Sequence, residues 1–244
     1  MTELVTNLAR VRERMARAAA RAGRSDQEIT LVAVSKTRPA AMIREGYHAG
    51  VRHFGENRVQ EWESKQAALT DLDATWQLIG HLQSNKARRA AGLFHSVDSV
   101  DSVALAQKLD SALAEMASDG NGKTSLGVLI EVRVSPEETK TGAELADLPA
   151  LVEAVLALPH LALRGLMCVP PFFEDAEKAR PFFRRLREAR DALRAQFGSQ
   201  SPGRGGESFL PELSMGMSHD FEVAIGEGAT QVRVGSAIFG ARTG

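Results

Sequence analysis

Residues 31–39 read Leu31-Val32-Ala33-Val34-Ser35-Lys36-Thr37-Arg38-Pro39. The first four are apolar in succession, which is typical of a parallel strand covered by helices on both faces. Pro39 suits the first turn of a following helix, because its fixed φ is already helical. The stretch therefore predicts a strand-to-helix junction with Lys36 at the end of the strand.

The same alternation of short apolar runs and longer helical patterns continues along the chain. We expect strands at Thr30–Ser35, Val51–Gly55, Trp76–Gly80, Leu93–Val97, Leu126–Val134, Leu163–Val169, Glu212–Met215 and Gln231–Gly235. Helical patterns lie near 40–49, 56–69, 84–91, 99–117, 147–158, 176–197 and 219–226, and an amphipathic helix over 4–22 comes first. Eight such units predict an α/β fold, a (β/α)8 TIM-type barrel with an extra N-terminal helix. A doubly wound open sheet is the alternative, although the Gly-rich first turn that often marks it is absent.

Composition narrows the class of protein. The chain has 244 residues, of which 43% are apolar, and we expect one domain over 1–244. A net charge of −1 excludes a global attraction to nucleic acid or to anionic membranes, and no apolar stretch is long enough to span a bilayer. The single cysteine, Cys168, is typical of a reducing compartment, so we expect a cytoplasmic protein. Six arginines within residues 1–24 indicate a solvated helix face rather than a nucleic-acid contact.

Two weak motifs are rejected. Gly122-Lys123-Thr124 resembles the end of a phosphate-binding P-loop, but it precedes a strand instead of following one. His95, Asp98 and Asp101 have spacing compatible with a metal site. Helix capping explains the two aspartates more simply, because we expect a helix to begin there, and we predict no metal.

Lys36 is the first candidate for chemistry. In a barrel of this class the carboxyl ends of the strands carry the ligand site. An amine at the mouth of an apolar strand is partly desolvated, which disfavours the ammonium form and favours addition to a carbonyl. From this segment alone, a lysine that reaches out to solvent remains the simpler interpretation.

Two loops near the C-terminus favour the chemical interpretation. Ser214-Met215-Gly216-Met217-Ser218 follows the seventh expected strand, and Gly235-Ser236 follows the eighth. Their hydroxyl and backbone N–H groups suit an anion, and the loops after strands seven and eight are the recurrent phosphate site of these barrels. An amine beside a phosphate site fits a phosphorylated aldehyde, of which pyridoxal 5′-phosphate (PLP) is the obvious example.

The chain resembles the pyridoxal phosphate homeostasis protein family, which shares its barrel with the N-terminal domain of alanine racemase. The matching segments are Ala33-Val34-Ser35-Lys36, Phe54-Gly55-Glu56-Asn57, Ile79-Gly80-His81-Leu82-Gln83-Ser84-Asn85-Lys86, Gly165-Leu166-Met167, Ser214-Met215-Gly216-Met217-Ser218 and Val232-Arg233-Val234-Gly235. Gln77 and Arg58 depart from the family pattern, which usually has histidine and often an aromatic residue at these positions. Neither is one of the expected anchors of the cofactor. The resemblance implies a PLP protein of fold type III.

The resemblance also implies a role for each site residue. Lys36 would carry PLP as a Schiff base, and Ser214, Ser218, Gly235 and Ser236 would hold the phosphate. Asn57 and Met167 would lie near the ring, and Arg233 would face the pyridine nitrogen. Lys140 would either add positive charge at the same face or be a solvated loop lysine.

Three functions remain open. The first is a non-catalytic PLP carrier or store, with PLP-dependent apo-enzymes as partners and a monomeric state. The second is an amino-acid racemase. It is disfavoured because the only tyrosine, Tyr47, falls in the helix after the first strand and the chain leaves no room for a second domain. The third is a ligand-free barrel that acts through its basic first helix.

Overall fold

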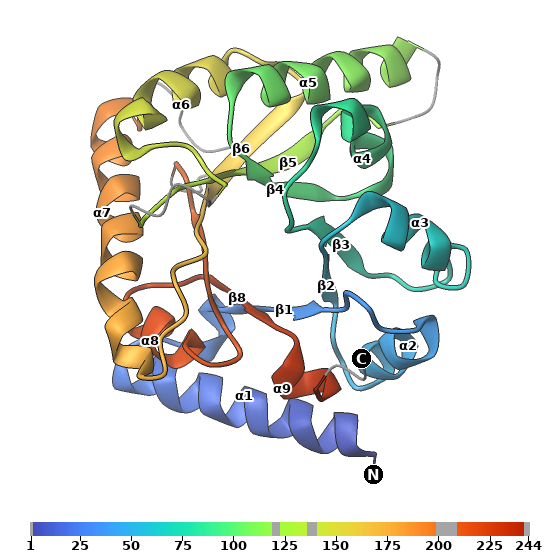
Figure 1. The fold of residues 1–244 in the computed structure, drawn as a ribbon, viewed down its shortest axis with the longest axis vertical. Helices are drawn as coiled ribbons and strands as arrows, with labels where there is room; N and C mark the ends of the chain where they lie inside the picture. The colour runs from blue at the N-terminus through green and yellow to red at the C-terminus, as the bar shows by residue number, and fades with distance from the viewer. Residues whose placement is uncertain (1, 119–122, 136–140, 199–208, 242–244) are drawn as a thin grey trace.

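The computed structural model describes residues 2–118, 123–135, 141–198 and 209–241. Within them, eight parallel strands form a closed barrel in the order β1 to β8, surrounded by helices (Figure 1). The strands are β1 (Thr30–Val34), β2 (His53–Glu56), β3 (Thr75–Leu78), β4 (Ser96–Val100), β5 (Leu126–Glu131), β6 (Leu161–Met167), β7 (Glu212–Met217) and β8 (Gln231–Val234). The helices are α1 (Glu3–Arg21), α2 (Ala40–His48), α3 (Val59–Gln66), α4 (Ala87–Leu93), α5 (Val103–Ser118), α6 (Leu148–Leu156), α7 (Arg180–Phe197), α8 (Phe221–Gly226) and α9 (Ser236–Phe239). The predicted TIM-type barrel with an extra N-terminal helix is confirmed.

The barrel closes between its first and last strands. Ala33 of β1 pairs with Val234 of β8, and Val34 pairs with Gly55 of β2. The residues that follow β1 and β8 are therefore neighbours at the carboxyl end of the barrel. The fold thus brings the segment containing Lys36 next to the loop at Gly235.

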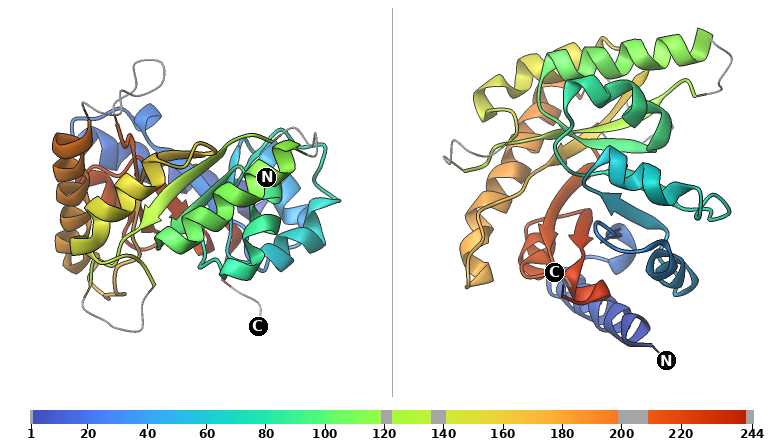
Figure 2. Two further views of the ribbon diagram at one scale, coloured as in Figure 1. Left: turned by 90° about the horizontal axis from the view of Figure 1, so that it is seen from above. Right: turned by 45° about the vertical axis from the view of Figure 1, so that its right-hand side comes forward.

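Helix α1 lies outside the βα alternation. It begins at Thr2, whose side chain accepts a hydrogen bond from the Val5 N–H, and its buried residues recur at helical spacing from Leu4 to Ala19. This apolar face packs against α8 and α9, and Figures 1 and 2 show the helix running alongside the C-terminal elements. No helix in the described ranges is long and apolar enough to cross a membrane.

The predicted strand at Leu93–Val97 is displaced, because β4 begins and ends three residues later. Leu93 ends α4, Phe94 is buried outside the barrel, and the strand runs instead from Ser96 to Val100. The displacement arises because the expected strand was placed on the apolar pair Leu93-Phe94, whereas β4 itself contains the buried polar residues Asp98 and Ser99. The other strands agree with their predicted bounds to within three residues at each end.

Asp98 is consequently not a helix cap. It lies in β4, is 1% exposed, and accepts a hydrogen bond from the Ser96 hydroxyl at 2.6 Å. The cap of α5 is Ser102, whose Oγ accepts from the Leu105 N–H. Asp98 belongs to the interior of the barrel.

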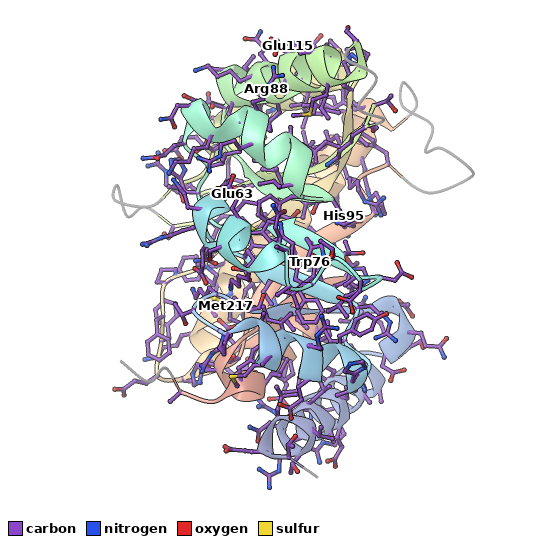
Figure 3. All side chains as sticks on the ribbon, turned by 90° about the vertical axis from the view of Figure 1, so that its right-hand side faces the viewer. Glu63, Trp76, Arg88, His95, Glu115 and Met217 are labelled. Carbon is purple, nitrogen blue, oxygen red and sulfur yellow. The ribbon has the colours of Figure 1, made fainter. Side chains whose placement is uncertain are left out.

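The interior of this barrel is unusually polar. TIM barrels are mostly filled by branched apolar side chains. Here the buried polar residues on the strands include Gln77, Asp98, Glu131, Ser214, Gln231 and Arg233. Gln77 and Gln231 border a cavity of about 460 Å³ at the amino ends of the strands, opposite the end where Lys36 lies. Figure 3 labels His95 at the amino end and Met217 at the carboxyl end, on opposite sides of the barrel.

Candidate cofactor site at the carboxyl ends of the strands

Lys36 lies in the turn directly after β1 and is half-buried. The Ser35 N–H still donates to the Gly55 carbonyl at 3.0 Å, so strand pairing persists up to the residue before the lysine. Thr37 then adopts φ 62°, a left-handed conformation that is uncommon for a threonine. Lys36 therefore lies at the barrel rim, where the chain turns sharply toward α2.

The loops after β7 and β8 are joined through one hydroxyl. Ser218 Oγ accepts hydrogen bonds from the N–H groups of Gly235 and Ala237, both at 3.3 Å. A Cβ at Gly235 would lie 3.3 Å from Val34 Cβ, which places this loop against the end of β1. Two backbone donors thus converge on a single oxygen beside the strand that carries Lys36.

Gly216 fixes the shape of the end of β7, just before the first of these loops. Its φ is 90°, and a Cβ there would lie 2.6 Å from Ala224 Cβ and 2.9 Å from Phe221 Cα. Only glycine fits this close approach of the end of β7 to α8. The helices that follow, α8 (six residues) and α9 (four residues), are short, so the groups that this end of the barrel offers to an anion are loop N–H and hydroxyl groups rather than a long helix dipole.

Arg233 lies on the inner face of β8 and is 3% exposed. Its Nη1 donates to Ser214 Oγ at 2.7 Å and its Nη2 donates to the Cys168 carbonyl at 2.8 Å. Ser214 is therefore separate from the Ser218 group, because it lies within β7, is fully buried, and is bound to the arginine. Met167, also fully buried, is in register with Ser214 at the end of β6.

Buried acids interact with the Arg233 guanidinium, and none of them is among the site residues expected from the sequence. Burial lowers the pKa of Arg233, while the negative charges of Asp98, Glu131 and Asp220 act to raise it. Burial in turn raises the pKa of each of these carboxyl groups, that of Asp98 to about 7. A signal existed for Glu131, because a carboxylate ends an otherwise apolar strand.

Asn57 lies directly after β2 and is half-buried. A Cβ at Gly80 would collide with the Asn57 backbone carbonyl, so the glycine of the Ile79-Gly80-His81 segment allows Asn57 its position. Asn57 also borders a cavity of about 690 Å³ between the loops after β2 and β3, together with His81 and Lys86.

The remaining predicted features are placed as follows. Tyr47 lies on the outer helix α2, where the Arg52 guanidinium stacks over its ring at 4.2 Å. Arg58 is exposed and Gln77 is buried in the barrel. Lys140 lies outside the described residues. Within the described ranges, no group of three or more His, Cys, Asp or Glu side chains is arranged to hold a metal ion.

Comparison with known proteins agrees with this fold. Residues 6–243 match the sequence family described as "Alanine racemase, N-terminal domain". The chain is 46% identical over 242 residues to the pyridoxal phosphate homeostasis protein of Pseudomonas aeruginosa, covering 99% of this chain and 97% of that protein. It is 40% identical to PipY of Synechococcus elongatus, solved with PLP bound, with a TM-score of 0.81 and coverage of 98% of this chain and 100% of that one.

Alanine racemases share the fold at a greater distance. The enzyme from Corynebacterium glutamicum is 17% identical, with a TM-score of 0.65 over 95% of this chain and 60% of the racemase. This likeness concerns the barrel alone. The chain belongs to the alanine racemase N-terminal domain family and, within it, to the pyridoxal phosphate homeostasis proteins.

Proposed function

We propose that residues 1–244 act as one domain that binds PLP as a Schiff base on Lys36 and serves PLP homeostasis as a carrier or store. The observation that carries this proposal is the closure of β1 on β8, which brings the lysine's strand against the Gly235 loop. The structure of PipY, which matches nearly the whole length of this chain, contains bound PLP, and this supports the same ligand here.

In this proposal the phosphate is held by Ser218, Gly235 and Ser236. Ser218 Oγ accepts both N–H groups, so its own hydroxyl hydrogen is left to donate to a phosphate oxygen. Ser214 is assigned an indirect role in the site, because its hydroxyl accepts a hydrogen bond from the Arg233 guanidinium and so fixes its position. Asn57 and Met167 are assigned to the surroundings of the ring.

We propose that amino-acid turnover is negligible. PLP supplies an electron sink that is strongest when its ring nitrogen is protonated, and a cationic Arg233 facing that nitrogen disfavours the proton. Racemisation further needs an acid/base group opposite the lysine. Tyr47 is packed on an outer helix under Arg52, which gives the racemase alternative no support.

PLP-dependent apo-enzymes are the proposed recipients, and the protein is proposed to be a cytoplasmic monomer. The large apolar side chains exposed in the described ranges are Leu156, Val169 and Phe172, too few for an obligate interface. Cys168 is fully buried, which is compatible with a reducing compartment.

The test is a Lys36→Ala variant compared with Lys86→Ala, a second lysine at the same end of the barrel. Both proteins are mixed with PLP, their visible spectra are recorded, and borohydride-reduced samples are mapped by mass spectrometry. We expect the imine band and the mapped adduct to disappear only in Lys36→Ala. A band of wild-type strength in Lys36→Ala would refute the assignment. Exchange of the α-hydrogen of added amino acids at about 1 per second or faster would favour the racemase alternative.

A further inference from the structure

A charged cluster, buried except for Glu61, packs against the Lys36 turn. It consists of Glu56 at the end of β2 and of Glu61 and Lys65 on α3. Lys65 Nζ donates to Glu56 Oε1 at 2.8 Å and to Glu61 Oε1 at 2.9 Å. Lys65 is 8% exposed and Glu56 is fully buried.

The cluster contacts the backbone on both sides of Lys36. Lys65 Nζ also donates to the Ser35 carbonyl at 2.9 Å, and Ser35 Oγ donates to Glu56 Oε1 at 2.6 Å. The Thr37 N–H donates to Glu61 Oε1. The residue before Lys36 and the residue after it are thus both held by the same three side chains.

Thr37 explains why such contacts are needed. A left-handed threonine is strained by about 1 kcal/mol or more and persists only where its surroundings fix it. The bond from its N–H to Glu61 is such a constraint. Without this hydrogen bond, Thr37 can relax toward an ordinary backbone conformation. The Lys36 side chain would then leave the strand in a different direction.

The energetics of the cluster also indicate a role other than stability. Removing two charges from water costs about as much free energy as their attraction in the protein interior returns. Buried ion pairs therefore contribute little net stability compared with apolar packing. Burial raises the pKa of Glu56, while the Lys65 ammonium and the Ser35 hydroxyl act in the opposite direction. A cluster retained under these conditions and bonded to two consecutive peptide units is better explained by the geometry that it imposes.

We propose that Glu61 and Lys65, with Glu56, are positioning residues for the Lys36 amine: by holding Ser35 and Thr37 they aim the side chain that forms the Schiff base. This inference rests on the proposed function and extends it to three residues outside the phosphate and ring contacts. The cluster should matter for ligands that react with the amine and should not matter for ligands that only occupy the phosphate and ring sites.

The experiment compares two ligands on the full-length chain. PLP forms an imine, whereas pyridoxine 5′-phosphate has the same phosphate and ring but an alcohol in place of the aldehyde. The variants are Glu61→Ala, which removes both bonds of that carboxylate, Glu61→Gln, which keeps an oxygen for the Thr37 N–H, and Lys65→Met. The matched control is Glu63→Ala, which lies on the same helix (Figure 3) but pairs with Arg89 of α4 instead of contacting the Lys36 turn. Binding of PLP is followed by the imine band, and binding of the alcohol is followed by calorimetry.

We expect Glu61→Ala and Lys65→Met to weaken PLP binding about tenfold, the equivalent of one hydrogen bond, and to leave pyridoxine 5′-phosphate affinity unchanged. Glu61→Gln should restore most of the PLP affinity, and Glu63→Ala should match the wild type. Should Lys65→Met fail to fold, Glu61→Ala decides alone.

Two results would overturn the inference: PLP affinity in Glu61→Ala equal to that of the control, or equal weakening for both ligands, which would indicate a general loosening of the fold. Failure of the proposed function is recognised separately, because it appears as an imine band that survives in Lys36→Ala.

Discussion

Replacing Ser218 by alanine tests the phosphate site most directly. Its Oγ accepts two backbone N–H groups at 3.3 Å, across the two loops. Neutral hydrogen bonds contribute about 0.5–1.5 kcal/mol each, and these two are long and half-exposed. We therefore expect Ser218→Ala to lower the free energy of unfolding of the ligand-free protein by only about 1 kcal/mol in total, or Tm by about 2–4 °C.

The effect on PLP affinity should be larger. A hydrogen bond to a charged phosphate contributes about 1.5–3 kcal/mol, so we expect PLP binding to weaken about 10- to 100-fold. Pyridoxal, which lacks the phosphate, should bind the wild type and Ser218→Ala equally. The four affinities form a double-mutant cycle whose coupling energy isolates the contact between Ser218 and the phosphate.

The assay is titration of the imine band with each ligand, together with thermal unfolding without ligand. Ser102→Ala is the matched control, because it removes a hydroxyl that caps α5 and contacts neither loop. A coupling energy below about 0.3 kcal/mol, within the scatter expected for independent sites, would refute the phosphate site at Ser218.

Two further predictions concern stability. Gly216→Ala should destabilise the protein by about 3 kcal/mol in urea unfolding, because its Cβ would lie 2.6 Å from Ala224 Cβ at a φ of 90°. Gly23→Ala, at φ 68° but with open space around it, should cost only about 1 kcal/mol, and equal losses would contradict the packing argument. Burial raises the pKa of Asp98 from 3.8 to about 7, so the folded state binds a proton that the unfolded chain releases, and this carboxyl reduces stability progressively as pH rises from 4 to 7. Asp98→Asn should therefore be more stable than wild type at pH 8 and equal to it at pH 4 in unfolding titrations. A loss of stability at pH 8 would show instead that the carboxylate is stabilised by its surroundings.

The alternation of strands and helices was predictable from the sequence because it depends on local patterns. Lys36, Ser218 and Gly235 were identified for the same reason, since each follows a recognisable strand. Their proximity followed from one general rule, that parallel strands place their carboxyl ends on one side.

The contacts inside the barrel were not predictable in this way. The bond between Arg233 and Ser214 depends on the register of β7 against β8, which shifts between Ser214 and Met217. Glu61 and Lys65 have the spacing of an ordinary surface pair on a helix, and the sequence holds no sign that they are turned toward the Lys36 turn. Asp98 was assigned to a helix because a buried carboxyl inside a strand contradicts the usual apolar pattern.

The pairing of β1 with β8 also has a consequence for the time at which the site comes into existence. During synthesis, Lys36 leaves the ribosome long before Gly235, roughly 10 to 40 seconds earlier at about 5–20 residues per second. Until the last strand is added, the lysine has no phosphate loop beside it, and any aldehyde that reaches it is held by the imine alone. If Lys36 and the Gly235 loop hold the cofactor as proposed, tight binding is restricted to chains that have finished both translation and barrel closure, and the bound cofactor would link the earliest and latest parts of the barrel. A nascent or truncated chain, although it contains the reactive amine, would bind the cofactor only weakly and would release it again.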